Sequence, residues 1–227
     1  MKNYYNQLLS KNYESFTING KYYNYKKDAD EIAKVISGKD ILEIGIGSGL
    51  LANILIDRGF NVEGIEPSAH MLKIIKKKFP KIKVVKQDLV HLNMRKKYDA
   101  IISHGTFPLI SIRKGIPYFD CFVNNDKEIL HILTLVKRHL KNNGLFISNV
   151  QSDKQENKKI RNIYKNELLF KDNFSLKKHY FYINGKWKLT QTIKSVVCTE
   201  EQFNNLLAKA GFSNTKFNKN KTVWIAK

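Results

Sequence analysis

The spacing of hydrophobic and polar positions changes several times along the chain, and these changes delimit the expected elements. Residues 1–25 are polar and rich in tyrosine, without sustained periodicity, and are expected to form an N-terminal arm. Over residues 26–37 apolar side chains recur at helical spacing, and Gly38 follows as a stop. The short apolar run Asp40–Ile44 then ends in glycines, which is typical of a buried parallel strand.

The same alternation continues as far as residue 150. The next expected elements are a helix at 48–58, strands at 61–66 and 81–86 around a helix at 68–79, a strand at 98–103, a helix at 126–141 and a strand at 144–150. Strands that alternate with helices in this way predict an α/β fold, with a parallel sheet and right-handed crossovers. No internal repeat or linker divides the chain, so we expect a single domain over residues 1–227.

Beyond residue 150 the pattern is different. Residues 151–170 are charged and are expected to be helical in part. Asn184-Gly185 separates two alternating runs, 174–183 and 186–197, which is a strong signal for an inserted antiparallel hairpin. The last expected elements are a helix over 200–210, capped by Thr199 and ended by Gly211, and two strands near Thr215 and Val223.

Composition adds limits on the class of protein. With 227 residues, 42% of them hydrophobic, the chain can build a sizeable core. It has no apolar run of about 18 residues, so no membrane-spanning helix is expected. The first residues lack the apolar block of a secretory signal. Two cysteines, Cys121 and Cys198, are too few for a disulfide framework or a zinc site, and they favour a reducing cytoplasm.

The net charge of +20 raises the question of a nucleic-acid partner. Lysine greatly outnumbers arginine, 35 to 5, whereas phosphate and base recognition favours the bidentate guanidinium of arginine. Half of the excess, +10, lies after residue 150. We therefore expect most of this charge to be solvated surface, with nucleic acid a possible but not a favoured partner.

The most informative segment is the turn after the first strand, Glu43-Ile44-Gly45-Ile46-Gly47-Ser48-Gly49. Glycines there let the backbone turn tightly and approach a ligand closely. A dinucleotide fingerprint would need a further glycine where Leu50 stands, and a phosphate loop would end in Gly-Lys-Ser/Thr. Both of those classes are disfavoured, and the turn alone does not distinguish a ligand site from a turn that binds nothing.

Three later residues follow other strands and favour a ligand site. Glu66 closes the second strand, where a carboxylate can accept hydrogen bonds from both hydroxyls of a ribose. Asp88 follows the third strand, where it can accept from an exocyclic amine while the N–H of Leu89 faces a ring nitrogen. His104 leaves the fourth strand. Ligands bind at the carboxyl ends of parallel strands, so together these positions predict an adenosine pocket without a pyrophosphate site.

The series Glu43-x-Gly45-x-Gly47-x-Gly49, Glu66 and Asp88, followed by Asp99-Ala100-Ile101-Ile102-Ser103, resembles the class I S-adenosylmethionine-dependent methyltransferases over nearly the whole chain. The resemblance implies a doubly wound, Rossmann-like sheet of strand order 3-2-1-4-5-7-6, with strand 7 antiparallel. It also implies a cofactor-binding half over 26–150, an insert over 151–197 and a closing helix and strand pair over 198–227. The cofactor contacts that it implies are Tyr25, Glu43, Gly45, Gly47, Gly49, Glu66, Pro67, Asp88, Leu89 and Ser103.

A fainter resemblance concerns the acceptor. The tyrosine-bearing arm, the segment Asn24-Tyr25-Lys26-Lys27-Asp28-Ala29 and the late hairpin are similar to small-molecule N-methyltransferases of the glycine and amino-sugar types. This resemblance implies that Tyr25 contacts the methionine part and that Tyr13 points at the acceptor. The segment between Pro108 and Asn125 is longer than in those enzymes, which leaves the acceptor open.

Methyl transfer from a sulfonium is an in-line displacement that gains most from positioning and needs no metal. His104 is the best-placed base for an acceptor that loses a proton, although a histidine there can also simply pack in the cleft wall. We expect an N or O nucleophile of a small molecule or peptide as acceptor. Two alternatives stay open: an RNA methyltransferase, not of the adenine-N6 type because no Asn-x-Pro-aromatic motif follows the fourth strand, and an inactive cofactor-binding partner subunit.

Overall fold

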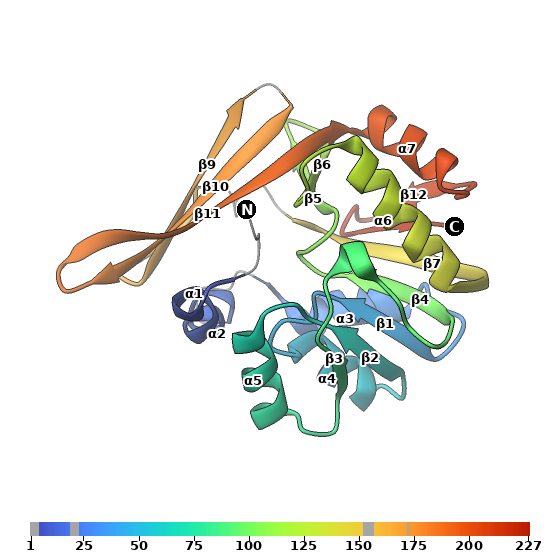
Figure 1. Cartoon of the computed structure of the whole chain (residues 1–227), viewed down its shortest axis with the longest axis horizontal. Coiled ribbons are helices and arrows are strands. Elements are labelled where there is room, and N and C mark those ends of the chain that lie inside the picture. The colour runs from blue at the N-terminus through green and yellow to red at the C-terminus, as the bar shows by residue number, and fades with distance from the viewer. Residues whose placement is uncertain (1–4, 19–22, 152–156, 172) are drawn as a thin grey trace.

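The computed structural model describes residues 5–18, 23–151, 157–171 and 173–227. Its helices are α1 (Gln7–Lys11), α2 (Tyr13–Thr17), α3 (Tyr25–Ala33), α4 (Leu50–Asp57), α5 (Ala69–Lys78), η1 (Leu89–His91), α6 (Asp126–His139) and α7 (Glu200–Lys209). Its strands are β1 (Asp40–Ile44), β2 (Asn61–Ile65), β3 (Lys83–Val85), β4 (Tyr98–Ser103), β5 (Leu109–Arg113), β6 (Ile116–Cys121), β7 (Leu140–Gln151), β8 (Lys159–Ile160), β9 (Tyr164–Lys171), β10 (Phe174–Ile183), β11 (Lys186–Thr199), β12 (Thr215–Phe217) and β13 (Val223–Ala226). Figure 1 shows their arrangement.

The first half of the chain builds the expected parallel sheet. Strands β3, β2, β1, β4 and β7 are neighbours in that order and run parallel. Strand β13 joins β7 in the antiparallel direction, and β12 pairs with β13. In the strand numbering of the predicted methyltransferase sheet, β7 corresponds to the fifth strand, and β12 and β13 correspond to the sixth and the seventh. The predicted order 3-2-1-4-5-7-6, with an antiparallel strand 7, is confirmed.

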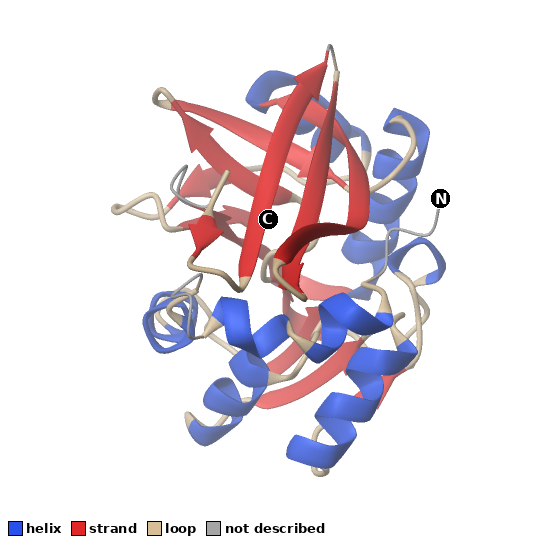
Figure 2. Cartoon of the chain, turned by 90° about the vertical axis from the view of Figure 1, so that its left-hand side faces the viewer, coloured by secondary structure: helices blue, strands red, loops and turns tan. Residues whose placement is uncertain are grey.

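The two faces of this sheet have separate cores because successive side chains of a strand point to opposite faces. On β1, Leu42 belongs to a cluster that includes buried residues of α6 and α7, whereas Ile41 belongs to a cluster with residues of α3, α4 and α5. On β4, Ile101 and Ala100 divide in the same way. Figure 2 shows the helices gathered around the parallel strands. Both faces are therefore closed, and the strand ends remain available for a site.

The antiparallel part of the fold is larger than the single hairpin expected from the sequence. The end of β7 pairs with β5, and from there the order continues through β6, β11, β10, β9 and β8. The predicted hairpin around Asn184-Gly185 is present as β10 and β11. The hairpin β5–β6, which turns at Lys114-Gly115, was not expected. Strands β9, β10 and β11 form a long twisted ribbon beyond the parallel sheet (Figure 1).

The prediction that residues 151–170 are partly helical is wrong for the part that the structure describes. Residues 159–160 and 164–171 form β8 and β9. Tyr164 and Asn166 are buried while Lys165 is half-buried, so the alternation has a period of two. Asn166 is polar although it is buried, and Leu169 is apolar although it is 49% exposed, so the alternation is hidden in the sequence. Residues 152–156 lie outside the described residues.

The ends of the chain also add detail. The arm expected over 1–25 contains two short helices, α1 and α2, of which α1 begins after an Asn6 side chain that accepts from the N–H of Leu9. The predicted cap of α7 is confirmed: Thr199 and Gln202 form a reciprocal capping box. In the described residues, no helix is both long and apolar enough to cross a membrane.

Candidate active site

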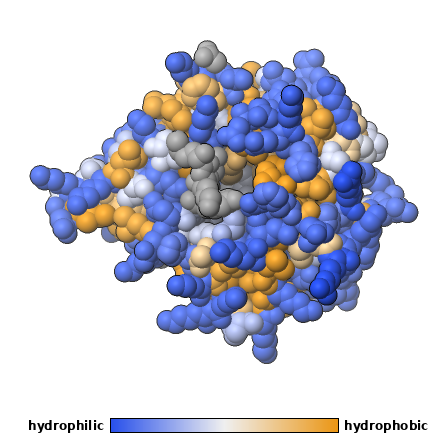
Figure 3. Space-filling view, in the orientation of Figure 1, coloured by the Kyte–Doolittle hydropathy of each residue, from blue (hydrophilic) through white to orange (hydrophobic). Residues whose placement is uncertain are grey.

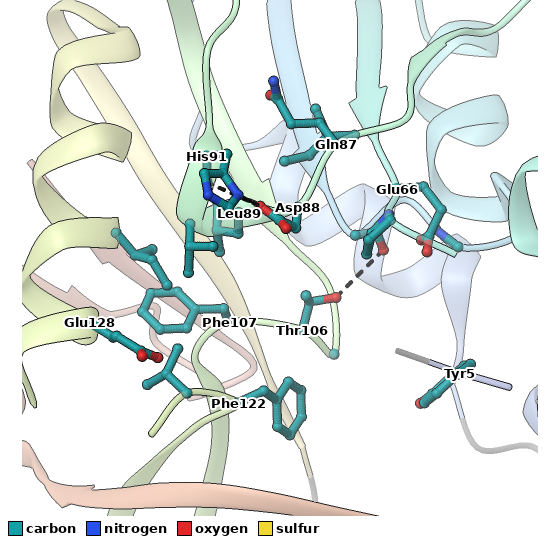
Figure 4. Close-up of a pocket in the computed structure, with 18 of the residues that line it drawn as sticks. Tyr5, Glu66, Gln87, Asp88, Leu89, His91, Thr106, Phe107, Phe122 and Glu128 are labelled. Carbon is teal, nitrogen blue, oxygen red and sulfur yellow. Dashed lines mark hydrogen bonds and ion pairs between the residues drawn. The ribbon is translucent and has the colours of Figure 1, made fainter. Parts of the chain in front are cut away.

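A cavity of about 650 Å³ opens at the carboxyl ends of the parallel strands, between α5, α6 and the arm. Its wall consists of Tyr5, Tyr13, Gly45, Gly47, Ile65, Glu66, Pro67, Met71, Gln87, Asp88, Leu89, Val90, His91, His104, Gly105, Thr106, Phe107, Phe122, Val123, Asn124, Lys127, Glu128, His131, Ile132 and Ile193. Figure 4 shows Glu66 and Asp88 at one side of it and Glu128 and Phe122 at another. Its size is in the range of small-molecule and cofactor pockets.

The glycine turn forms one wall because its backbone takes conformations that other residues adopt rarely. Gly45 has φ 66° and Gly47 has φ 57°. A Cβ at Gly45 would lie 2.6 Å from the Thr106 side chain, so this glycine allows the turn to pack against the segment after β4. At Gly47 the nearest atom to such a Cβ would be 3.9 Å away. The backbone of Gly47 therefore borders open space on the cavity side of the turn.

Glu66 is fixed by the backbone on both sides of it. Its Oε2 accepts from the N–H of Gly47 at 2.9 Å and its Oε1 accepts from the N–H of Ser68 at 2.8 Å. The residue is only 6% exposed. Burial raises the pKa of Glu66 to about 6, although the hydrogen bonds from these two N–H groups have the opposite effect and lower it. Each carboxylate oxygen has a second lone-pair direction, so Glu66 can still accept from a ligand.

Glu43 lies behind the glycine turn and does not line the cavity. Its Oε2 is buried without a hydrogen-bond partner among the described residues. Burial, and then the nearby charge of Glu66, raises the pKa of Glu43 to about 8. At neutral pH Glu43 is therefore mostly protonated, and a cation placed near it would favour loss of that proton.

Replacing Glu43 by glutamine is expected to remove a pH dependence of stability. The folded protein keeps a proton on Glu43 up to about pH 8, whereas the unfolded chain releases it near the ordinary value of 4.5. Folding thus takes up a proton, and the free energy of unfolding falls as the pH rises through this window, by at most about 1.4 kcal/mol per unit. Between about pH 6 and 7, urea unfolding of Glu43→Gln should lack roughly 1 kcal/mol of the decrease seen for the unaltered protein. Equal pH slopes would contradict this assignment.

Asp88 caps the N-terminus of the short helix η1 and also lines the cavity. It precedes η1, and its Oδ1 accepts from the N–H of His91 at 3.1 Å and lies 2.6 Å from His91 Nδ1 (Figure 4). The Asp88 side chain is 25% exposed. Leu89 follows it in the wall. This pair thus presents a carboxylate and an apolar side chain next to each other, which suits the edge and the face of a purine ring.

His104 lies at the end of β4, buried beside two aromatic rings. Its Nε2 is 2.9 Å from Oδ2 of Asp28 on α3. Its ring centroid is 4.6 Å from that of Tyr23 and 5.3 Å from that of Tyr25. Because Nε2 faces Asp28, Nδ1 is the ring nitrogen without a partner among the described residues. This is the arrangement of an imidazole oriented by a carboxylate.

The arm covers the cavity and is held on two sides. Asn6 contacts β11 through Gln191 Oε1, at 3.1 Å, and through the Thr190 carbonyl oxygen, at 2.7 Å. Glu14 on α2 forms an ion pair with Lys78 on α5 at 2.8 Å. These contacts place the arm between the parallel sheet and the antiparallel ribbon.

Tyr13 brings a hydroxyl from the arm into the cavity wall. This hydroxyl lies 3.5 Å from that of Tyr25. Burial raises the pKa of Tyr25 to about 12 and that of Tyr13 well above its usual value, so both hydroxyls are neutral near pH 7. They can donate and accept hydrogen bonds but do not act as bases at neutral pH.

The structure brings eight of the sequence-predicted site residues into one wall. These are Tyr13, Gly45, Gly47, Glu66, Pro67, Asp88, Leu89 and His104. The other four, Tyr25, Glu43, Gly49 and Ser103, do not line the cavity. Gly49 begins α4 with φ 79°, and a Cβ there would lie 2.7 Å from Ile75, which points to packing. The hydroxyl of Ser103 accepts from the N–H of Phe107 at 2.7 Å.

Most of the residues that line the cavity beyond the cofactor motifs were not predicted from the sequence. The missed residues include Tyr5, Thr106, Phe107, Phe122, Lys127, Glu128, His131 and Ile193. They come from the arm, the segment after β4, α6 and β11, which the chain brings together only by folding. One signal was present: the segment between Pro108 and Asn125 departs from the resembling family, and Phe122 lies in it. No group of three or more His, Cys, Asp or Glu side chains in the described residues could hold a metal ion.

Comparison with known proteins finds similarity to methyltransferases. A family model described as a methyltransferase domain matches residues 41–144. An uncharacterized methyltransferase of Alkaliphilus oremlandii (strain OhILAs) is 35% identical over 92 residues, which are 39% of this chain and 43% of the relative. A chloroplastic ribosomal RNA small subunit methyltransferase of Arabidopsis thaliana is 31% identical over 111 residues, 44% of this chain and 32% of the relative. The chain thus spans less than half the length of these curated relatives.

Solved structures match over nearly the whole chain. An S-adenosylmethionine-dependent methyltransferase from Clostridium acetobutylicum ATCC 824 superposes with a TM-score of 0.71 at 18% identity, over 97% of this chain and 98% of that one. The sugar N-methyltransferase KedS8 from Streptoalloteichus sp. ATCC 53650 gives 0.67 at 13% identity, over 94% and 91%. The fold is that of the class I methyltransferases. Residues 41–144 match a methyltransferase domain, and the chain shares its fold with S-adenosylmethionine-dependent methyltransferases.

Proposed function

We propose that this protein transfers a methyl group from S-adenosylmethionine to a nitrogen or oxygen nucleophile of a small molecule or peptide. One observation carries the proposal. The glycine turn, Glu66 and Asp88 line the same cavity as His104 and Tyr13, so cofactor-type and acceptor-type residues share one space. A cavity with both kinds of residue suits a reaction in which two ligands meet.

The residues present fit S-adenosylmethionine. The buried Oε2 of Glu43 is without a partner beside the glycine turn, and a bound ammonium group nearby would supply compensating charge. The backbone at Gly47 borders open space, which a chain-like ligand can occupy. When bound, this cofactor supplies a methyl group on a positively charged sulfur. Burial within this cavity would keep water away from that group.

Each part of the cofactor has a matching set of residues. Glu66 accepts hydrogen bonds and suits the ribose hydroxyls, since its two oxygens are already oriented by Gly47 and Ser68. Asp88 and Leu89 suit the adenine, with a hydrogen-bond acceptor for the amine and an apolar surface for the ring. The turn at Gly45 and Gly47 suits the methionine part, where a side chain would obstruct the approach.

The acceptor side contains the groups that an amine or hydroxyl acceptor needs. His104 can accept a proton on Nδ1 while Asp28 holds Nε2 and stabilises the charge that forms. Tyr13, with its neutral hydroxyl, can hydrogen-bond the nucleophile and so hold it in line with the methyl group. These roles for His104 and Tyr13 are part of the proposal.

An RNA acceptor is the second candidate, because the net charge is +20 and one matched relative is named as a ribosomal RNA methyltransferase. Hydrophilic residues cover most of the face in Figure 3, with hydrophobic residues exposed towards its middle. The arm and β11, however, roof the cavity through Tyr5, Tyr13 and Ile193. A roofed cavity favours a small acceptor or a flexible peptide end over a folded RNA.

Two measurements test the proposal in sequence. Isothermal titration should show binding of S-adenosylmethionine at one site per chain, and absence of binding would reject the function. Transfer from labelled S-adenosylmethionine is then compared between a panel of small amines and hydroxyl compounds and total RNA. We expect incorporation into small molecules only. Incorporation into RNA, together with affinity that falls steeply with salt, would favour the RNA candidate instead.

A further inference from the structure

The end of β7 carries two buried amide side chains, those of Asn149 and Gln151, which are 4% and 6% exposed. These residues are two positions apart on one strand and therefore point to the same side of it. Burying an amide costs free energy unless it is hydrogen-bonded, so an apolar residue would be less costly at either position. The groups to which the two amides bond therefore indicate what they do.

Both amides bond to segments that adjoin His104. Oδ1 of Asn149 accepts from the N–H of Gly105 at 2.8 Å and so holds the main chain directly after His104. Nε2 of Gln151 donates to the hydroxyl of Tyr23 at 2.6 Å and so holds a side chain from the segment before α3. The end of β7 thus contacts, through two neighbouring side chains, both segments that meet at the imidazole.

Gly105 leaves room for the contact between Gln151 and Tyr23. Its φ is 71°, which residues other than glycine adopt rarely. A Cβ at this position would overlap the Tyr23 hydroxyl and would lie 3.4 Å from Nε2 of Gln151. The hydroxyl, the amide and the backbone of Gly105 are therefore closely packed, although they come from three separate parts of the sequence.

Three side chains surround the His104 ring, and Tyr23 is the one that no helix positions. Asp28 and Tyr25 both belong to α3, so this helix fixes the carboxylate that faces Nε2 and one of the two aromatic neighbours. Tyr23 lies before the helix, and its ring centroid is 4.6 Å from that of His104. Its place beside the imidazole therefore depends on tertiary contacts, and the hydrogen bond from Gln151 is one of them.

We propose that Gln151 is a positioning residue for His104: it fixes the Tyr23 ring against the imidazole and so keeps the imidazole in the orientation in which Nε2 faces Asp28. Gln151 lines two small recesses beside the main cavity but not the main cavity itself, so it acts on the site through Tyr23. This inference rests on the proposed function for the role of His104 as a base. The orientation of the ring, in contrast, is measurable without turnover.

The ring signals of His104 in nuclear magnetic resonance report its orientation, because a neighbouring aromatic ring shifts them. The full chain is labelled with ¹³C and ¹⁵N at histidine, and the His104 signals are assigned by their loss in His104→Asn. Gln151→Leu should shift or broaden these signals. Tyr23→Phe, which keeps the ring and removes only the hydroxyl, should have the same effect, and the double variant should add no further change because both remove one hydrogen bond.

Two results would overturn the proposal. One is a set of His104 signals that Gln151→Leu leaves unchanged. The other is a change in Gln151→Leu without one in Tyr23→Phe, since Gln151 would then act by another route. If Gln151→Leu does not fold, Tyr23→Phe decides alone, because it deletes one oxygen atom from a half-buried side chain.

Asn166→Leu is the matched control for the loss of a buried amide. Asn166 is 2% exposed, and its Oδ1 accepts from the N–H of Lys158. It lines neither the main cavity nor the two recesses. This variant should lower the free energy of unfolding without moving the His104 signals. An equal change of those signals in Asn166→Leu would show a general loosening of the fold and would overturn the specific role of Gln151.

Turnover then separates this inference from the proposed function. The acceptor used is the compound of the small-molecule panel that is methylated fastest. Gln151→Leu should lower kcat by about tenfold or more, because a displaced catalytic group reacts more slowly. The KM for the acceptor and the dissociation constant of S-adenosylmethionine should stay within about twofold. A raised KM with unchanged kcat would overturn the proposal, because it would assign Gln151 to acceptor binding.

The proposed function can fail while this inference stands. If S-adenosylmethionine does not bind, or no compound of the panel is methylated, the function is rejected. A change of the His104 signals in both Gln151→Leu and Tyr23→Phe would still identify Gln151 as the residue that orients the ring.

Discussion

Replacing Glu66 by glutamine is expected to weaken S-adenosylmethionine binding by at least about 100-fold, which corresponds to about 2.7 kcal/mol. The reason is that both carboxylate oxygens already accept backbone N–H groups, from Gly47 and from Ser68. A glutamine turns an N–H₂ donor towards one of those donors, so the turn and the ligand contact change together. Hydrogen bonds to a charged group contribute about 1.5–3 kcal/mol each, and two such contacts to a ribose account for the expected loss.

Glu63→Gln is the matched control because Glu63 is on the same strand, β2. Its carboxylate accepts from the Tyr98 hydroxyl at 3.0 Å and lies 3.0 Å from Lys96, and it does not line the cavity. This variant should bind S-adenosylmethionine within about twofold of the unaltered protein. Calorimetric titration of both variants provides the measurement. An affinity for Glu66→Gln within about tenfold of the unaltered value would remove Glu66 from the ribose contact.

The pH dependence of cofactor affinity gives a second test of the role of Glu66. Burial raises the pKa of Glu66 to about 6, so its carboxylate becomes protonated at a pH where an exposed one is still ionised. A protonated Glu66 presents one oxygen as a donor and loses its charge. The affinity for the cofactor should therefore fall below about pH 6 in the unaltered protein, and this decrease should be absent in Glu66→Gln.

The parallel half of the fold follows from the sequence because its signals are local. Apolar runs such as Asp40–Ile44 need no distant partner to be recognised as buried strands, and the glycines after this run mark the turn. The carboxyl ends of parallel strands meet at one edge, so Glu66 and Asp88 are expected in one site as soon as the strands are placed. Both do line the cavity.

The antiparallel half is less predictable because the alternation of apolar and polar residues along its strands is interrupted. On β9, Tyr164 and Asn166 point inward, but Asn166 is polar and is buried because its side chain bonds to the N–H of Lys158. A buried asparagine breaks the apolar alternation that reveals a strand. On β10, His179 is equally hidden, since no local feature distinguishes an inward-facing histidine from an exposed one.

The candidate base shows the same limit within the site itself. His104 is indicated by its place after the fourth strand, but its partner Asp28 is 76 residues earlier and comes from α3. Only the packing of α3 against the sheet, through buried residues such as Ala29 and Ile32, brings the carboxylate to the ring. Side chains that meet in this way carry no shared spacing in the sequence.

His104→Asn is expected to lower kcat by about 100-fold with an amine acceptor, which is the lower end of the contribution of general bases. Asparagine retains a polar side chain of similar reach but cannot take up a proton. The dissociation constant of S-adenosylmethionine should stay within about twofold, because the glycine turn, Glu66 and Asp88 are unchanged. The measurement is kcat with one saturating amine acceptor, compared between the variant and the unaltered protein at several pH values.

Asp28→Asn separates the positioning of His104 from its chemistry. Asparagine can still hold Nε2 through a hydrogen bond but no longer stabilises a positive imidazole, so kcat should fall by about tenfold. Asp30→Asn on the same helix is the matched control, since Asp30 pairs with Arg58 on the protein surface. A kcat for His104→Asn within about threefold of the unaltered value across the pH range would assign His104 to packing between Tyr23 and Tyr25. In that case positioning of the acceptor, rather than removal of its proton, would account for the acceleration.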